Sequence, residues 1–294
     1  MILDVLRDHG PTLVDGMLIA PGEHSSYTII LSAPGVDRTF LHYPGPNYTF
    51  AAADVPDAAF DGACIFHVGY PPLMRQMYLN EGRELASLFR RARAHGLVTS
   101  LDMTKPDPES EAGRIDWPAF MGRVLPHVDI FLPSLEEILF MLDRARYEQL
   151  EQRAGGTGVI SLVDAEVLDD LSSRLLDLGV AVAGLKLGAQ GMLLRTTVDA
   201  GRWSALSAQL DLNPRAWANR ELLAPTFRAR LVGTTGAGDC AVAGFLAGLL
   251  HRQTPEVVLV SAVAVGACNV EAADAISGVP SWDAVQQRVQ AGWE

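Results

Sequence analysis

From residue 63 onward, the sequence alternates short apolar runs with longer amphipathic segments, and this alternation restricts the possible folds most strongly. Residues 63–68 are an apolar run that ends at Gly69, whereas residues 80–95 place apolar side chains on one helical face. Short apolar runs predict buried strands, and a period of about 3.6 residues predicts helices. Strands that alternate with helices indicate a mainly parallel sheet with helices on both faces. We therefore expect an α/β fold, and 294 residues allow one large domain or two smaller ones.

The same criteria divide the middle of the chain into further elements. Helices are predicted over residues 117–125, 135–142 and 164–178, and strands over residues 97–101, 128–132, 180–187 and 191–195. Residues 203–222 show weak periodicity, and we interpret them as a long loop or an insertion.

The first 50 residues follow a different pattern from the rest of the chain. Two strand-like segments, residues 27–32 and 38–43, flank Pro34-Gly35-Val36-Asp37, a composition that is typical of turns. An antiparallel hairpin over residues 25–45 is therefore expected, as a small sheet beside the main domain.

Composition and charge limit the partners of the chain. The net charge of −12 and the lack of a basic run argue against nucleic acid. No apolar run reaches the roughly 18 residues that a membrane span needs, and we expect no signal peptide because the first residues are charged. Cys64, Cys240 and Cys268 lack metal spacing and stand in apolar surroundings, so we expect reduced core thiols of a cytoplasmic protein. His67 is likewise expected in the core.

Residues 231–245 combine an apolar segment, a loop of small residues and a helix-like apolar run, with Asp239 at the junction. Glycines allow positive φ and the close approach of a ligand, while the start of a helix offers unpaired N–H groups and the positive end of its dipole. These features predict an anion site, and phosphate is the usual anion. Asp239 is the single carboxylate of the loop, so we expect it to remove a proton from an attacking hydroxyl.

Two other interpretations of this loop stay open at the level of sequence. Gly236, Gly238 and Ala241 also fit the loose dinucleotide fingerprint G-x-G-x-x-A, although that fingerprint normally opens the first βαβ unit of a domain. A helix-entry turn with Asp239 as its cap is the structural alternative. A Walker A loop is excluded, because it needs a Gly-Lys-Ser/Thr sequence that this loop lacks.

Residues 233–239, Gly-Thr-Thr-Gly-Ala-Gly-Asp, resemble the D-T-x-G-A-G-D signature of the ribokinase-like sugar kinases, the PfkB family, with glycine in place of the first Asp. The resemblance implies a single ribokinase-like α/β domain over residues 1–294, in which the hairpin over residues 25–45 is a lid. The same resemblance implies Asp239 as the catalytic base. It also assigns contacts with the phosphoryl group and the nucleotide to the loop residues Gly236, Ala237, Gly238 and Thr234.

Two segments resemble parts of the family that contact the substrate. Gly45-Pro46-Asn47 resembles the Gly-Ala-Asn that faces the sugar, with a plain turn as the alternative. Residues 100–105 resemble a strand end at which Asp102 contacts the substrate, and the alternative there is a helix cap.

Residues 129–137 resemble the family's Asn-x-x-Glu segment, with Ser134 where Asn is usual, and Glu137 is then expected to help order the metal and phosphate. Ser134 and Glu137 also fit a capping box, and the two roles can coexist.

Two later segments resemble the nucleotide site of the family. Residues 185–191 resemble its strand and turn, which assigns nucleotide contacts to Lys186, Gly188 and Gly191, with a bare hairpin turn as the alternative. Residues 262–271 resemble the helix that packs against the adenine. Asn269 of that helix is either a nucleotide contact or a core or cap residue.

The family normally begins with a strand that carries an Asp for the sugar, then a Gly-Gly-x-x-x-Asn segment and several βα units, and none of these is recognisable here. Residues 1–10 instead resemble the helix before the lid. We therefore expect a shortened N-terminus that leaves the strand at residues 63–68 or 97–101 with an open edge. The chain is then expected to be inactive on free sugars or to self-associate, for instance as a homodimer.

The sequence thus predicts an ATP-dependent kinase that phosphorylates a hydroxymethyl group of a sugar or nucleoside. ATP and Mg²⁺ are the expected cofactors, with a monovalent cation as a further candidate. A non-catalytic relative that binds a sugar or nucleotide on the same fold is the main alternative, and a dinucleotide-dependent oxidoreductase fits less well.

Overall fold

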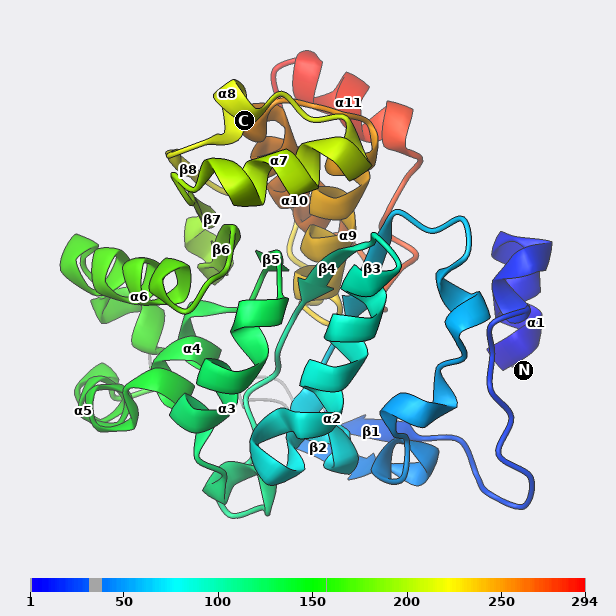
Figure 1. Cartoon of the computed structure of the whole chain (residues 1–294). Helices are drawn as coiled ribbons and strands as arrows, with labels where there is room; N and C mark the ends of the chain where they lie inside the picture. Colours follow the sequence, from blue (N-terminus) through cyan, green and yellow to red (C-terminus); the bar gives the residue numbers. More distant parts are fainter. Residues whose placement is uncertain (1, 32–38, 157, 294) are drawn as a thin grey trace.

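The computed structural model describes residues 2–31, 39–156 and 158–293, and it places a six-stranded sheet at the centre of the molecule (Figure 1). In spatial order the strands are β3 (Ile65–Val68), β4 (Val98–Leu101), β5 (Ile130–Phe131), β6 (Val182–Lys186), β7 (Met192–Thr196) and β8 (Glu221–Ala224). Strands β3 to β6 pair in parallel, and β6, β7 and β8 pair antiparallel. The expected α/β fold with a mainly parallel sheet is confirmed.

Helices cover both faces of this sheet (Figure 1). One core cluster joins the sheet to α2 (Arg75–Ala94), α3 (Trp117–Val124), α4 (Leu135–Leu142), α5 (Arg144–Ala154) and α6 (Ala165–Asp177). A second cluster joins it to α7 (Ala200–Leu210), α8 (Pro214–Trp217), α9 (Ala237–Leu250) and α10 (Pro255–Asn269), and α11 (Trp282–Gln290) packs on α10. Successive strand residues point to opposite faces, so Phe131 of β5 joins the first cluster and Ile130 joins the second.

Helix α2 begins at Arg75, earlier than the predicted helix, and a break in its backbone separates a short first turn from the long helix after Gly82. The backbone leaves helical geometry over residues 79–82, and three of these four residues have positive φ. A Cβ on Gly82 would lie 2.6 Å from Phe120 of α3. The close approach of α3 therefore requires glycine at this position.

The prediction of a long loop over residues 203–222 is wrong. This segment contains most of α7, all of α8 and the start of β8, and Asp199 and Asn213 cap the two helices with their side chains. Trp203 and Trp217 are buried, with ring centroids 5.8 Å apart. Packing on these two indole rings, rather than the weak apolar period of the segment, stabilises both helices.

The N-terminal region carries the expected hairpin and the expected helix over residues 1–10. Strand β1 (Tyr27–Leu31) pairs antiparallel with β2 (Thr39–Tyr43), and the helix is α1 (Ile2–His9). All ten strand residues are exposed. The turn predicted at residues 34–37 lies outside the described residues. In the part of the chain that the structure describes, no helix is long and apolar enough to span a membrane.

Strand β3 lies at one edge of the sheet, which corrects two expectations. Cys64 and His67 are exposed rather than part of the core, because among the described strands β3 has a neighbour on one side only. Cys240 and Cys268 are buried as expected. The open edge expected at residues 63–68 or 97–101 lies at the first of these, since β4 is fully buried between β3 and β5.

Candidate active site

The carboxyl ends of the parallel strands bring several predicted site residues to one edge of the sheet. Asp102 directly follows β4, Lys186 ends β6, and Glu137 lies in the first turn of α4, just after β5. Ligands of open α/β sheets bind at this edge, because the connecting loops leave a crevice there. The site is therefore assembled from segments that are far apart in the sequence.

A buried ion pair forms the floor of the site. The Lys186 Nζ lies 2.7 Å from each carboxylate oxygen of Asp102, whose side chain is 2 % exposed, against 12 % for Lys186. The Met103 N–H also donates to Asp102, at 2.8 Å. Burial raises the pKa of the Asp102 carboxyl, and the Lys186 ammonium opposes that rise. The positive charge of Lys186 is thus held in a fixed position.

The glycine loop lies against this ion pair. Gly236 precedes α9 with a φ of 80°, and a Cβ there would lie 2.7 Å from the Ala275 carbonyl oxygen. A Cβ on Gly238 would lie 3.5 Å from the Lys186 Nζ. Ala237 is the first residue of α9, where N–H groups have no partner within the helix and the helix dipole is positive. The loop and Lys186 together form a positively polarised cradle.

Asp239 lies in the first turn of α9 and is exposed. The Tyr70 side chain, from the turn after β3, lies close enough to this carboxylate to feel its charge. Burial and the Asp239 charge raise the pKa of Tyr70 far above its ordinary value, so the hydroxyl keeps its proton. An exposed carboxylate beside the cradle can accept a proton from a bound hydroxyl group.

Tyr70 and His67 are site residues that the sequence analysis did not identify. The Nδ1 of His67 lies 3.0 Å from the Ser100 Oγ. Although part of the His67 side chain is exposed at the sheet edge, partial desolvation of its ring together with the Lys186 charge lowers its pKa. The ring is therefore neutral at pH 7. The available signal was a tyrosine between a glycine and two prolines, directly after an apolar strand.

Glu137 combines a structural contact with an unusual electrostatic environment. It forms the expected capping box with Ser134, whose N–H donates to the Glu137 Oε2 at 2.7 Å. Burial raises the pKa of Glu137 to about 7, with Asp102 adding to the rise and Lys186 opposing it. Among the described residues, no group of three or more His, Cys, Asp or Glu side chains is arranged to hold a metal ion. The role of Glu137 in metal ordering stays a prediction.

The turn between β6 and β7 requires its glycines. Gly188 and Gly191 have φ values of 56° and 98°, and the Leu187 N–H donates to the Gly191 carbonyl at 2.8 Å. A Cβ on Gly191 would lie 1.9 Å from the Ala224 carbonyl oxygen at the end of β8. The turn between β6 and β7 thus abuts the end of β8.

Thr234 lies exposed in the glycine loop, and its carbonyl oxygen accepts the Ala237 N–H at 3.3 Å.

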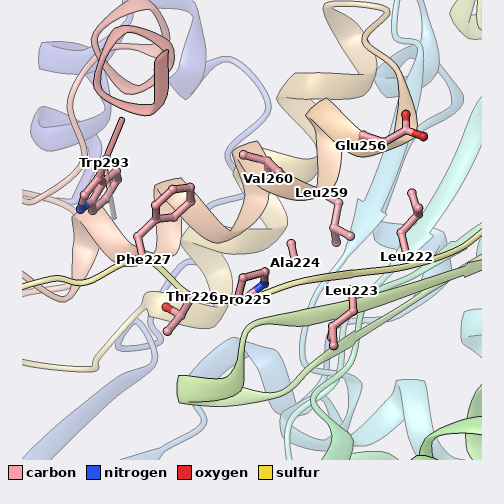
Figure 2. A pocket seen from close by; sticks show the side chains of 10 residues that line it. All are labelled: Leu222, Leu223, Ala224, Pro225, Thr226, Phe227, Glu256, Leu259, Val260 and Trp293. Carbon is pink, nitrogen blue, oxygen red and sulfur yellow. The ribbon is translucent and has the colours of Figure 1, made fainter. Parts of the chain in front are cut away.

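A mostly apolar pocket of about 460 Å³ opens beside this turn (Figure 2). It is lined by β8, the segment after β8, α10 and the C-terminal Trp293, through the residues Leu222, Leu223, Ala224, Pro225, Thr226, Phe227, Glu256, Leu259, Val260 and Trp293. Phe227 stacks on Trp293 with centroids 4.6 Å apart. Asp102, Lys186, Asp239 and Tyr70 are not among the residues that line the pocket. The pocket adjoins the turn through Ala224, whose carbonyl oxygen faces Gly191.

Two further predicted contacts, Asn269 and Asn47, make their hydrogen bonds with protein groups. Asn269 is fully buried at the end of α10, and its Nδ2 donates to the Ala275 carbonyl at 2.7 Å, so it fixes the segment that packs against Gly236. This is the core role that the sequence left open. Asn47, in a 3₁₀ turn over Gly45–Tyr48, donates to the Ser26 Oγ at 3.2 Å. Direct contacts of both residues with a ligand stay predictions.

Comparison with known proteins finds a matching family model and several similar solved structures. A family model described as pfkB family carbohydrate kinase matches residues 12–282. No curated protein sequence matches the chain significantly. Among solved structures, ribokinase from Giardia lamblia has a TM-score of 0.66 at 17 % identity, covering 99 % of this chain and 79 % of that one.

Two further similar structures contain ligands. Aminoimidazole riboside kinase from Salmonella enterica, complexed with aminoimidazole riboside and an ATP analog, has a TM-score of 0.59 at 22 % identity, covering 85 % of this chain and 70 % of that one. A structure from E. coli named as a ribokinase II, in complex with ATP and Mg²⁺, has a TM-score of 0.64 at 18 % identity. The alignment covers 92 % of this chain and 72 % of that one. These similarities establish a shared fold.

Proposed function

Because this chain belongs to the pfkB family of carbohydrate kinases, we propose that it transfers the γ-phosphoryl group of ATP to a hydroxymethyl group of a sugar or nucleoside. One observation carries the proposal. The exposed carboxylate of Asp239 lies in the first turn of a helix whose glycine loop packs against Lys186. A base and an anion cradle are then adjacent, as phosphoryl transfer to a hydroxyl requires.

In the proposed mechanism, Asp239 removes the proton of the acceptor hydroxyl as that oxygen bonds to phosphorus. The N–H groups of Gly236 and Gly238 donate to the phosphoryl oxygens, where negative charge develops, and that of Ala237 joins them once its 3.3 Å hydrogen bond to the Thr234 carbonyl opens. Lys186 adds a positive charge beside the loop, and Asp102 keeps its ammonium in place. Donors that are fixed before the reaction stabilise the transition state without reorganisation.

The residues present fit ATP and Mg²⁺. Glycine at 236 and 238 keeps the cradle clear of side chains, and the apolar pocket beside Gly191 gives a place for the adenine base. Glu137 supplies a carboxylate near the cradle, and Mg²⁺ prefers such oxygen ligands. When bound, ATP supplies the phosphoryl group and Mg²⁺ neutralises part of its charge. A monovalent cation stays a further candidate.

The charges of the site favour a neutral acceptor. Lys186 is already paired with Asp102, and Asp239 adds a carboxylate beside it. An acceptor that carries a phosphate or carboxylate would meet the Asp239 carboxylate, and Lys186, the cation beside it in the described part of the site, is already paired. A neutral sugar or nucleoside, like the riboside bound by the Salmonella enterica kinase, is therefore the proposed acceptor class.

The test is ADP formation from ATP and Mg²⁺ over a panel of neutral sugars and nucleosides, with phosphorylated sugars as matched anionic acceptors. We expect turnover with one or more neutral acceptors and little with the anionic ones. ATP binding without ADP formation on any acceptor would favour the non-catalytic relative. Binding of NADH in place of ATP would favour the oxidoreductase.

A further inference from the structure

A second, smaller pocket of about 240 Å³ lies where three helices meet. The start of α3, the last turn of α4 and the first residue of α5 line it, together with the 3₁₀ turn Ala112–Arg114. Asp102, Glu137, Lys186 and Asp239 are not among its lining residues. The pocket therefore shares none of these residues with the site proposed for phosphoryl transfer.

The charged side chains in the lining are two arginines, Arg114 and Arg144, although the whole chain has a net charge of −12. The Arg144 Nε donates to the exposed Glu148 at 2.7 Å, and its guanidinium carbon lies 3.9 Å from the centre of the Phe140 ring. These two contacts hold the plane of the guanidinium. Its two Nη groups make no hydrogen bond with the residues that the structure describes, so they are available to a ligand.

Arg114 is presented by a tightly bonded turn. Its Nη2 donates to the Glu109 carbonyl at 2.7 Å, and no ion pair with a described residue neutralises its charge. The Ser110 Oγ accepts the Gly113 N–H at 3.1 Å and donates to the Asp107 carbonyl at 2.6 Å. A Cβ on Gly113 would lie 2.1 Å from the same carbonyl oxygen, so the turn requires glycine there. The backbone that carries Arg114 is therefore fixed before any ligand binds.

The helix ends around the pocket add little to this positive charge. Trp117 is the first residue of α3 and Arg144 the first of α5, and the start of a helix is the positive end of its dipole. Asp116 and Asp143 cap these two helices with their carboxylates, which reduces that potential, but neither lines the pocket. The two guanidinium groups are thus the main source of positive charge.

The rest of the lining is mostly apolar, and this combination indicates the class of ligand. Arginine pairs with phosphate oxygens through two parallel hydrogen bonds. A phosphomonoester carries a charge of roughly −1.5 to −2 at pH 7, which matches two guanidinium groups better than a single carboxylate does. The buried side chains of Trp117, Phe140 and Met141 offer an apolar wall to the carbon part of such a molecule. The volume lies below the roughly 300–1,000 Å³ of drug-sized sites, so that carbon part is small.

We propose that this pocket binds a small phosphomonoester, with its phosphate group on Arg114 and Arg144 and its carbon part on the apolar wall. The inference goes beyond the proposed function and does not depend on it, because the two sites share none of the residues that carry either argument.

The first test locates the ligand with methyl signals of the full chain labelled with [¹³C-methyl]methionine. Met141 lines the pocket, whereas Met103 donates its N–H to Asp102 at the proposed active site. Titration with glycerol 3-phosphate should shift the Met141 signal in a saturable manner, and glycerol should leave it in place. An unmoved Met141 signal, or a shift confined to Met103, would overturn the inference.

The second test removes the two guanidinium groups. Arg114→Gln with Arg144→Gln should weaken glycerol 3-phosphate binding by about tenfold or more, measured on the Met141 signal. Arg123→Gln with Arg146→Gln is the matched control, because it removes the same charge from α3 and α5 outside the pocket. We expect wild-type affinity in the control, and thermal unfolding checks that both variants fold. Equal losses in the two variants would reflect net charge alone and contradict the proposal.

Inorganic phosphate separates the contribution of the phosphate group from that of the carbon part. Glycerol 3-phosphate should bind more tightly, because its carbon atoms contact the apolar wall. Equal affinities would overturn the assignment to a monoester. None of these measurements requires turnover, so a chain that phosphorylates no acceptor would contradict the proposed function and leave this test intact.

Discussion

At the residue scale, the candidate site depends on positions where the local geometry admits few side chains. Gly191 and Gly236 have positive φ, and a Cβ on either would lie within 2.7 Å of a backbone carbonyl oxygen. Substitution at these positions disturbs the backbone as well as the site. Gly238 differs, because its nearest neighbour would be the Lys186 side chain at 3.5 Å. A change at Gly238 therefore tests function more than folding.

Gly238→Val places a branched side chain beside Lys186, in the space proposed for phosphate. We expect about a 100-fold or greater loss of turnover, because the donors of the cradle can no longer approach the phosphoryl group. Steady-state kinetics with ATP, together with thermal unfolding, measures the effect. Gly122→Val is the control, because this exposed helical glycine has nothing within 4 Å of its Cβ position. Unchanged ATP kinetics in Gly238→Val would place the phosphate elsewhere.

Lys186→Met tests the buried ion pair. The substitution leaves the Asp102 carboxylate buried without its cation, so we expect the free energy of unfolding to fall by about 3–5 kcal/mol. Urea unfolding measures this loss, and adding Asp102→Asn should recover most of it because the uncompensated charge is then gone. A loss below about 1 kcal/mol, as for an exposed pair, would contradict the buried arrangement.

At the element scale, helix boundaries are predicted best where a clear helical period of apolar residues coincides with capping residues. The bounds of α4 match the prediction, since Ser134 and Glu137 cap its start, and α6 begins after the capping residue Asp164. Helices α7 and α8 were missed because the apolar side chains over residues 203–222 show only weak periodicity. The antiparallel return of β8 depends on pairing with β7, a tertiary contact that no local pattern encodes.

The residues of the candidate site likewise divide into those that a local pattern predicts and those that only tertiary contacts bring into place. Asp102, Lys186 and Asp239 were identified because they follow strands or occupy a glycine loop that resembles a family signature. Tyr70 and His67 belong to no motif. Their positions depend on β3 lying beside β4 and on α9 folding back toward it, which are contacts between residues far apart in the chain.

Glu137, in the first turn of α4, should make the free energy of unfolding depend on pH. Burial raises the pKa of Glu137 from 4.5 to about 7, so between these values the folded chain holds a proton that the unfolded chain has released. The free energy of unfolding should therefore fall as pH rises through this range without Mg²⁺, by about 3 kcal/mol at most. Urea unfolding over this range measures it. Glu137→Gln should flatten the slope, and equal slopes in both proteins would contradict the burial of this carboxyl.

At the scale of the whole molecule, the hairpin presents apolar surface outside the main core. Its register places the exposed side chains Tyr27, Ile29 and Leu31 of β1 on the same face as Leu41 and Tyr43 of β2. Exposed apolar patches of this kind mark interaction sites. The predicted homodimer would cover this face.

We expect the wild type to self-associate and the pair Ile29→Lys and Leu41→Lys to be monomeric, because two charges would be buried in the contact. Sedimentation velocity distinguishes the two states. The control is Thr28→Lys with His42→Lys, a cross-strand pair on the opposite face of the hairpin. A wild type that stays monomeric at every concentration would contradict this prediction.

The central claim is that Asp239 removes the proton of the acceptor, and Asp239→Asn tests it most directly. Asparagine keeps the size of the side chain but cannot take the proton, whereas Asp283→Asn makes the same change at an exposed position in the first turn of α11. Acceptor-dependent ADP formation should fall roughly 10²–10⁴-fold in Asp239→Asn, with ATP binding retained, and stay at the wild-type rate in Asp283→Asn. Wild-type turnover in Asp239→Asn would contradict the account and leave Asp239 as a helix-entry residue.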